Sequence, residues 1–147
     1  MKLFDIYTWA TGKKVTFLGQ FDIEEQKELY NQATQFWNSL ESNAYIFVIL
    51  FAVIGILIAW YYYIPFNNKP WRHYHPKWWV FWLCACFVLA FFGTLGLAYG
   101  LATPNLSGAW PIEIKLSLVN GLYAIGLYFI TSVCFCNYSK TNAYKIF

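Results

Sequence analysis

The chain has 147 residues, of which 59% are hydrophobic and only 12% are charged, about half the charged fraction of a typical soluble domain. Ten basic and seven acidic residues give a net charge of +3, which is too small and too dispersed to indicate nucleic-acid binding. Together with a mean hydropathy of +0.41, this composition argues against an ordinary soluble domain and favours an all-α integral membrane protein.

The first twenty residues contain two runs with high β-propensity, Ile6–Trp9 and Val15–Leu18, around the turn-like segment Ala10–Lys13. This pattern predicts a small N-terminal β-hairpin. A two-stranded hairpin is only marginally stable in water, so we expect it to dock against an apolar surface. A loosely ordered tail is the alternative that the sequence leaves open.

An amphipathic helix is expected over residues 22–41. Asp22 supplies an N-cap, and Glu25 follows three residues later, as in a capping box. The polar face carries more acidic than basic residues, whereas helices that lie on anionic lipid usually carry Lys and Arg there. We therefore expect the apolar face to contact a partner protein. The partner-contact residues are Leu29, Ala33, Phe36, Trp37 and Leu40.

Three apolar runs follow, and each reaches the ~20 residues that a helix needs to cross the hydrocarbon of a bilayer. The first two contain no charged residue, and Lys115 lies close enough to the start of the third to extend its ammonium group to the surface. The chain then divides into an extramembrane region (1–43), a three-span domain (44–137) and a short basic tail (138–147). The expected spans are residues 44–63, 78–102 and 114–136.

Aromatic residues and cations are concentrated between the first two spans. Trp and Tyr gather at both membrane–water interfaces, whereas Lys and Arg gather in cytoplasmic loops. The expected interfacial belt comprises Trp60, Tyr61, Tyr62, Tyr63, Trp71, Trp78, Trp79, Trp82 and Trp110, and the expected cytoplasmic basic loop comprises Lys69, Arg72 and Lys77.

The distribution of cations predicts the orientation of the spans. The loop between the first two spans and the C-terminal tail together hold five cations and no acidic residue, whereas only Lys27 and Lys115 lie near the membrane on the other side. The positive-inside rule therefore places the C-terminus in the cytoplasm and the N-terminus outside. The frequent Lys, Asn, Ile, Tyr and Phe suit an AT-rich genome, and we expect a bacterial inner membrane.

Small and polar residues within the spans predict helix packing. Gly96 and Gly100 form a G-x-x-x-G pair, which lets two helix backbones approach closely, and an Asn in hydrocarbon requires a hydrogen-bonding partner. Packing within the chain and contact with a neighbouring subunit both remain open. The expected packing residues are Gly55, Ala59, Gly93, Gly96, Gly100, Asn120, Gly121 and Ala124.

A metal site is a weak hypothesis. Thiols and imidazoles suit zinc or copper, but residues two apart on a helix point about 200° from each other, so a C-x-C pair on a helix does not readily share one ion. We therefore expect no metal and no cofactor. The weak candidates are His73, His75, Cys84 and Cys134.

The sequence contains no phosphate-binding loop, nucleophile elbow or zincin motif, and no Asp, Glu, Lys, Arg or His lies in the middle of a span. We expect a non-enzymatic membrane subunit that anchors a larger complex, with lipid and other membrane subunits or copies of itself as partners. The alternative is a homo-oligomeric pore, such as a holin or a membrane-permeabilising defence effector. A redox or metal-handling membrane enzyme ranks last. The polar stripe that a pore would require is interrupted in the third span, where the candidates are Ser117, Asn120, Thr131 and Ser132.

Overall fold

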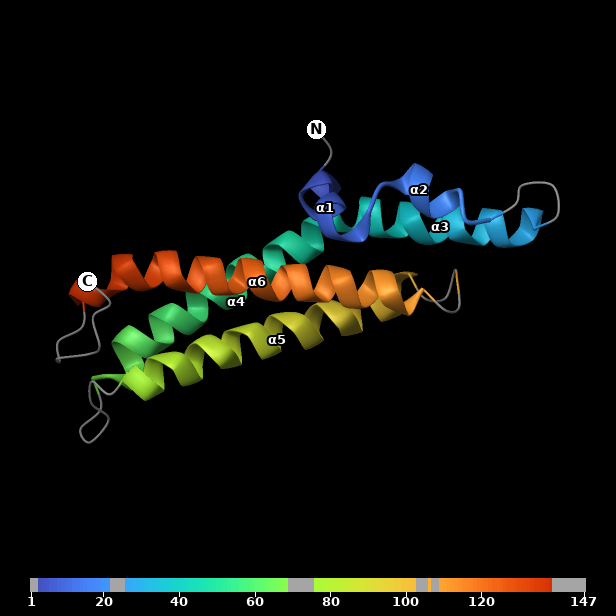
Figure 1. Cartoon of the computed structure of the whole chain (residues 1–147). Helices are drawn as coiled ribbons and strands as arrows, with labels where there is room; N and C mark the ends of the chain where they lie inside the picture. The colour runs from blue at the N-terminus through green and yellow to red at the C-terminus, as the bar shows by residue number, and fades with distance from the viewer. Residues whose placement is uncertain (1–2, 22–25, 69–75, 103–105, 107–108, 139–147) are drawn as a thin grey trace.

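In a computed structural model, the three apolar segments form long helices that lie side by side, and the preceding residues form shorter helices over one end of them (Figure 1). The structure describes residues 3–21, 26–68, 76–102, 106 and 109–138, and these residues contain no strand. All three long helices are long and apolar enough to cross a membrane. They are α4 (Ala44–Tyr61) with its continuation η2 (Tyr62–Phe66), α5 (Pro76–Ala102), and α6 (Trp110–Phe135) with the short η4 (Cys136–Tyr138).

The expected β-hairpin is not found, because residues 3–18 form three short helices. Phe4, Tyr7 and Thr11 are all buried on one side of this segment, as a helical repeat allows. A strand would have placed Phe4 and Tyr7 on opposite faces, since its side chains alternate. Tertiary burial of one face therefore overrides the local β-propensity. The helices are η1 (Leu3–Tyr7), α1 (Thr8–Thr11) and α2 (Lys14–Leu18).

A turn at Gly12 joins α1 to α2. Its φ of 84° lies in the region that glycine alone adopts without strain, and its N–H donates to the carbonyl of Thr8 at 3.0 Å. After this turn, α2 lies along the next helix, α3 (Lys27–Ser42) (Figure 1).

The amphipathic helix starts later than its capping pattern suggests. Gln26 is not helical, so α3 begins at Lys27, while residues 22–25 lie outside the described part of the chain. At the other end only Asn43 separates α3 from α4. The Asn43 side chain donates to the carbonyl of Ser39 at 2.8 Å, so the two helices meet in a capped bend rather than a loop.

The ends of the long helices also differ from the expected spans. The first helix continues three residues further, to Phe66, because a π-helical turn accommodates Pro65: the Asn67 N–H bonds to the carbonyl of Tyr62, five residues back. The third helix begins four residues earlier, at Trp110. Pro111 lies in its first turn, where the missing N–H costs nothing. The second begins at Pro76, two residues early.

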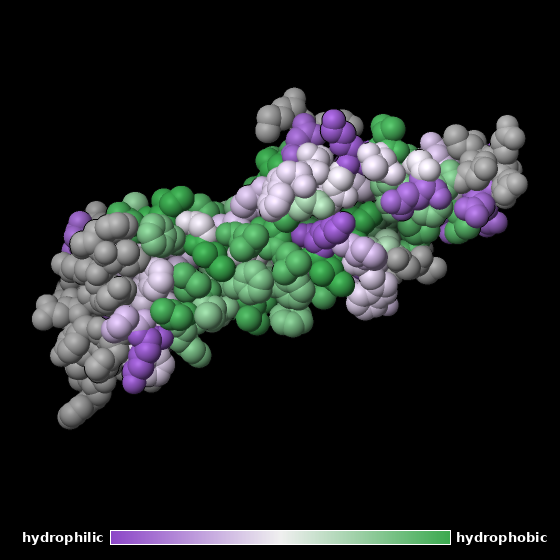
Figure 2. Space-filling model, in the orientation of Figure 1, coloured by the Kyte–Doolittle hydropathy of each residue, from purple (hydrophilic) through white to green (hydrophobic). Residues whose placement is uncertain are grey.

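The interior has two distinct ends. At the capped end, η1 to α3 cover the end of α5 and the start of α6. At the aromatic end, Tyr62 and Tyr63 pack fully buried against neighbouring rings. These two tyrosines of the expected interfacial belt are therefore buried within the protein, because the extended helix turns them inward. The elements η1, α1, α2 and α3 form an N-terminal layer. The visible surface is hydrophobic over the long helices and more hydrophilic over this N-terminal layer (Figure 2). The aromatic end comprises Tyr62, Tyr63, Phe66, Trp78 and Trp82.

Candidate functional site

Asn120 of α6 has no exposed surface and bonds to three other elements. Its amide nitrogen donates to the carbonyl of Phe47 in α4 at 3.0 Å and to the hydroxyl of Thr94 in α5 at 2.6 Å. Its amide oxygen accepts a 2.8 Å bond from the phenol of Tyr7 in η1. Thr94 in turn donates to the carbonyl of Ala90 at 2.7 Å. One side chain thus joins all three long helices to the N-terminal layer.

Two further bonds attach the N-terminal segment to α6. The hydroxyl of Tyr123 donates to the carbonyl of Ile6 at 2.7 Å and accepts a bond from the indole of Trp9 at 3.0 Å. Phe4 adds an edge-on ring contact with Trp37 of α3, with ring centroids 5.6 Å apart. The N-terminus is therefore held by directed bonds to α6 and by ring packing on α3.

The environment of Tyr7 favours its neutral form. Burial raises the pKa of the Tyr7 phenol well above its ordinary value of 10.0, and neighbouring Tyr123 raises the pKa further. The phenol consequently stays protonated and keeps its hydrogen available for Asn120. Neutral donors of this kind can hold a structure together but supply neither a nucleophile nor a general base.

Six of the expected packing residues lie between helices of this chain. A Cβ on Gly55 would lie 2.9 Å from the carbonyl oxygen of Ala124, and one on Gly121 would lie 2.7 Å from the ring of Phe87. These two glycines therefore set the distances of α4 and α5 from α6. Gly93 faces Leu50, where a Cβ would lie 3.3 Å from the side chain. The other three buried residues are Ala59, Asn120 and Ala124.

Gly96 and Gly100 lie on the outside instead. Both are exposed, and a Cβ added at either would meet no atom within 4 Å. The large side chains of Phe92 and Tyr99 on the same surface of α5 are 62% and 56% exposed. The G-x-x-x-G pair therefore makes no helix contact within the described part of the chain.

The apolar face of α3 is covered by the chain itself. Phe36, Trp37 and Leu40 are almost fully buried, and so is Ala33. Phe17 of α2 stacks on Trp37, with ring centroids 5.4 Å apart. This face is accordingly not available to a partner protein, a correction to the role expected for it. Leu29 alone among the five expected contact residues is exposed, at 42%.

The remaining interfacial and basic residues are distributed over the surface. Trp60 and Trp110 are exposed, at 43% and 55%, and Lys77 is exposed at the start of α5. Half-buried belt residues pack around the aromatic end; they are Tyr61, Trp78, Trp79 and Trp82. Outside the described residues lie Trp71, Lys69 and Arg72.

The cysteines do not gather into a cluster. Cys84 and Cys134 are exposed, whereas Cys86 and Cys136 are buried, as expected for residues two apart on a helix. His73 and His75 lie outside the described residues. Within the described part of the chain, no group of three or more His, Cys, Asp or Glu side chains is close enough to hold a metal ion.

Sequence reasoning missed Tyr7 and Thr94 as partners of Asn120. Thr94 was detectable in principle, because it is a polar residue within an otherwise apolar stretch of α5. Tyr7 was assigned to a strand, and the carbonyl of Phe47 leaves no sequence signal at all. The arrangement as a whole binds the helices together.

Comparison with known proteins adds no further constraint: no family model, no curated protein and no solved structure matches this chain.

Proposed function

We propose that this chain is a non-enzymatic multi-pass membrane subunit that anchors a larger membrane protein complex through helix–helix packing. The observation that supports the proposal best is the exposed glycine surface of α5. Gly96 and Gly100 are exposed beside the large side chains of Phe92 and Tyr99, and no other part of the described chain lies within 4 Å of a Cβ added at either glycine. In lipid, such small-residue surfaces let a second helix backbone approach closely.

The contrast among the glycines strengthens this proposal. Gly55 and Gly121 are needed for contacts within the chain, since a Cβ at either would come closer than 3.0 Å to another atom. No contact within the described part of the chain requires glycine at positions 96 and 100. We propose that a transmembrane helix of another subunit packs against Gly96 and Gly100. The chain's own three long helices already bond to one another through Asn120.

The burial of polar groups on α6 is the reason to prefer this function to a homo-oligomeric pore. Asn120 bonds inward, Ser117 donates to the carbonyl of Glu113, and Thr131 donates to the carbonyl of Leu127. A water-filled pore requires polar groups that face its lumen. The large exposed side chains of α6 are mainly apolar instead, and they include Ile114, Leu118, Leu122, Phe129, Ile130 and Val133.

The orientation that we propose has the N-terminus outside and the C-terminus in the cytoplasm of a bacterial inner membrane. The end of η2, the start of α5 and the end of α6 lie at the same end of the bundle (Figure 1). Lys77 lies in the first turn of α5, and the sequence that follows η2 and α6 carries Lys69, Arg72, Lys140 and Lys145. The positive-inside rule favours the cytoplasmic side for segments of this composition.

Bulky substitutions on the exposed glycine surface of α5 test the proposal. Gly96→Leu and Gly100→Leu should abolish the larger complex that wild type forms in its native membrane, as measured by native gels after mild detergent extraction. Gly126→Leu is the matched control, because Gly126 is also exposed in a long helix with no atom within 4 Å of a Cβ. An unchanged complex in both α5 variants contradicts the proposal. A complex that contains this chain alone, with dye leakage from liposomes, supports the pore.

A further inference from the structure

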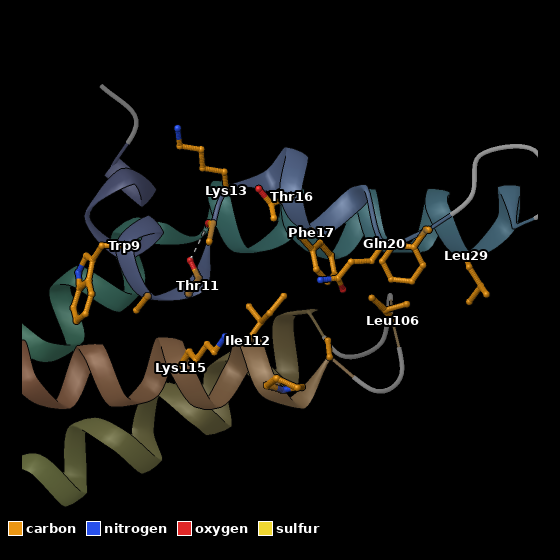
Figure 3. A pocket seen from close by; sticks show the side chains of 15 residues that line it. Trp9, Thr11, Lys13, Thr16, Phe17, Gln20, Leu29, Leu106, Ile112 and Lys115 are labelled. Carbon is orange, nitrogen blue, oxygen red and sulfur yellow. Dashed lines mark hydrogen bonds between the residues drawn. The ribbon is translucent and has the colours of Figure 1, made fainter.

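A cavity of about 620 Å³ lies between the N-terminal helices α1 and α2 and the start of α6, a volume typical of small-molecule sites. Figure 3 shows the side chains that line it from both sides. Phe17 comes from α2 and Gln20 from the turn that follows it, while Ile112 and Lys115 come from α6. Leu106, between α5 and α6, closes one part of the wall.

The polar groups of this cavity favour an anion. Lys115 is exposed, and its ammonium group lies beside Ile112 on the α6 side of the cavity (Figure 3). No hydrogen bond or ion pair engages Lys115 within the described part of the chain. The lining contains no Asp or Glu. The amide of Gln20 approaches from the opposite wall (Figure 3) and adds a neutral donor. Lys13 also lines the cavity, but its ammonium group points away.

Beside these groups and the hydroxyls of Thr11 and Thr16, the wall carries apolar and aromatic side chains. Phe17 and Phe21 are in edge-on contact, with ring centroids 5.5 Å apart, and Leu106 and Ile112 belong to the buried core of the capped end. A small inorganic anion would gain no binding free energy from contact with these apolar side chains. The lining therefore suits a molecule that carries a negative group and an apolar part together.

The position of the cavity along α6 indicates where such a molecule comes from. Trp110 is 55% exposed at the start of α6. Tryptophan is enriched at the headgroup level of a bilayer, and this position fits that level. Lys115 lies about 7.5 Å from Trp110 along α6 at 1.5 Å per residue.

We propose that this cavity binds an anionic phospholipid. Its phosphate pairs with the Lys115 ammonium group, Gln20 donates to a headgroup oxygen, and the first part of an acyl chain lies against Phe17 and Ile112. The proposal shares with the proposed function only the insertion of the long helices into a bilayer. It does not depend on the exposed glycine surface of α5.

The test measures how many phospholipid molecules the full chain retains in detergent, by native mass spectrometry. Wild type should retain phosphatidylglycerol in preference to phosphatidylcholine. Lys115→Gln should lower that retention roughly tenfold, as expected for the loss of a charge-assisted bond. Lys115→Arg should restore it. Lys77→Gln is the matched control, because Lys77 is equally an exposed helix lysine but lies at the other end of the bundle.

A second variant separates the lipid from a free anion. Phe17→Ser should lower the retention of phosphatidylglycerol and leave the binding of inorganic phosphate unchanged. Binding of inorganic phosphate that depends on Lys115, without a preference for phosphatidylglycerol, overturns the lipid assignment. Equal retention of both lipids, or equal retention by wild type and Lys115→Gln, overturns the site. Gly96→Leu should leave lipid retention unchanged. The lipid site and the proposed subunit contact can therefore fail independently of each other.

Discussion

The two ends of the helical bundle differ in the contacts that surround their buried side chains. At the capped end, Asn120 fixes Tyr7, Thr94 and the backbone of Phe47 through directed bonds. At the aromatic end, closely packed rings surround the buried side chains; the ring centroid of Phe66, for example, lies 5.4 Å from that of Trp78 and 5.5 Å from that of Trp82. Hydrogen bonds specify one register of the helices, whereas packed rings fill space and tolerate substitution by other apolar side chains of similar volume.

The largest effect is expected from Asn120→Leu. The substitution leaves the buried Tyr7 phenol without its acceptor and should lower the free energy of unfolding by about 2–3 kcal/mol. Reversible unfolding in mixed micelles measures it. Asn31→Leu, at an exposed position of α3, is the control and should change stability by less than about 0.5 kcal/mol. Equal effects of the two substitutions would mean that the network contributes nothing.

A double substitution sharpens this measurement. Removal of both partners in Asn120→Leu with Tyr7→Phe leaves no orphaned phenol, so the combined loss should be smaller than the sum of the single losses. Strict additivity would show that Tyr7 and Asn120 act independently.

A smaller effect is expected from Tyr7→Phe alone, about 1–1.5 kcal/mol for one lost hydrogen bond. The difference from wild type should also depend on pH. The raised pKa keeps Tyr7 protonated in the folded chain, whereas in the unfolded chain the phenol ionises near pH 10. The stability from Tyr7 is therefore complete below about pH 10 and declines above it.

Unfolding measured at neutral pH and above about pH 10 tests this dependence, with Tyr45→Phe as the control, since Tyr45 is 53% exposed. A wild-type advantage that grows with rising pH would have the wrong sign and refute the account of Tyr7.

The smallest effect is expected from Phe66→Leu at the aromatic end. Phe66 is only 3% exposed, but neighbouring rings can move into part of the space, so the loss should stay near 1 kcal/mol. The same unfolding assay measures it. A loss as large as that of Asn120→Leu would remove the distinction between the two ends.

The long helices were predictable because length and uninterrupted hydrophobicity are local properties of the chain. The ends of these helices were harder to predict. The π-helical turn at Pro65 depends on a hydrogen bond between Asn67 and Tyr62, and the residues that usually end a helix do not indicate such a bond. The N-terminal layer was predicted in the wrong class. Phe4 and Tyr7 become helical through burial against Trp37 and α6, contacts that their own neighbourhood does not reveal.

The candidate site was predictable only in part. An Asn within an apolar run indicates that some partner exists, but the sequence does not identify it. The glycines illustrate the same limit, because Gly55 and Gly96 look alike in the sequence. Only the three-dimensional arrangement separates the glycine that brings α4 onto α6 from the one that faces outward.

The junction at Asn43 has a mechanical consequence. Because one residue separates α3 from α4, and its side chain is tied back to Ser39, there is no slack between the N-terminal layer and the first long helix. We therefore expect α3 and the first turns of α4 to move together, with Phe47 of α4 attached to Asn120 close to the junction.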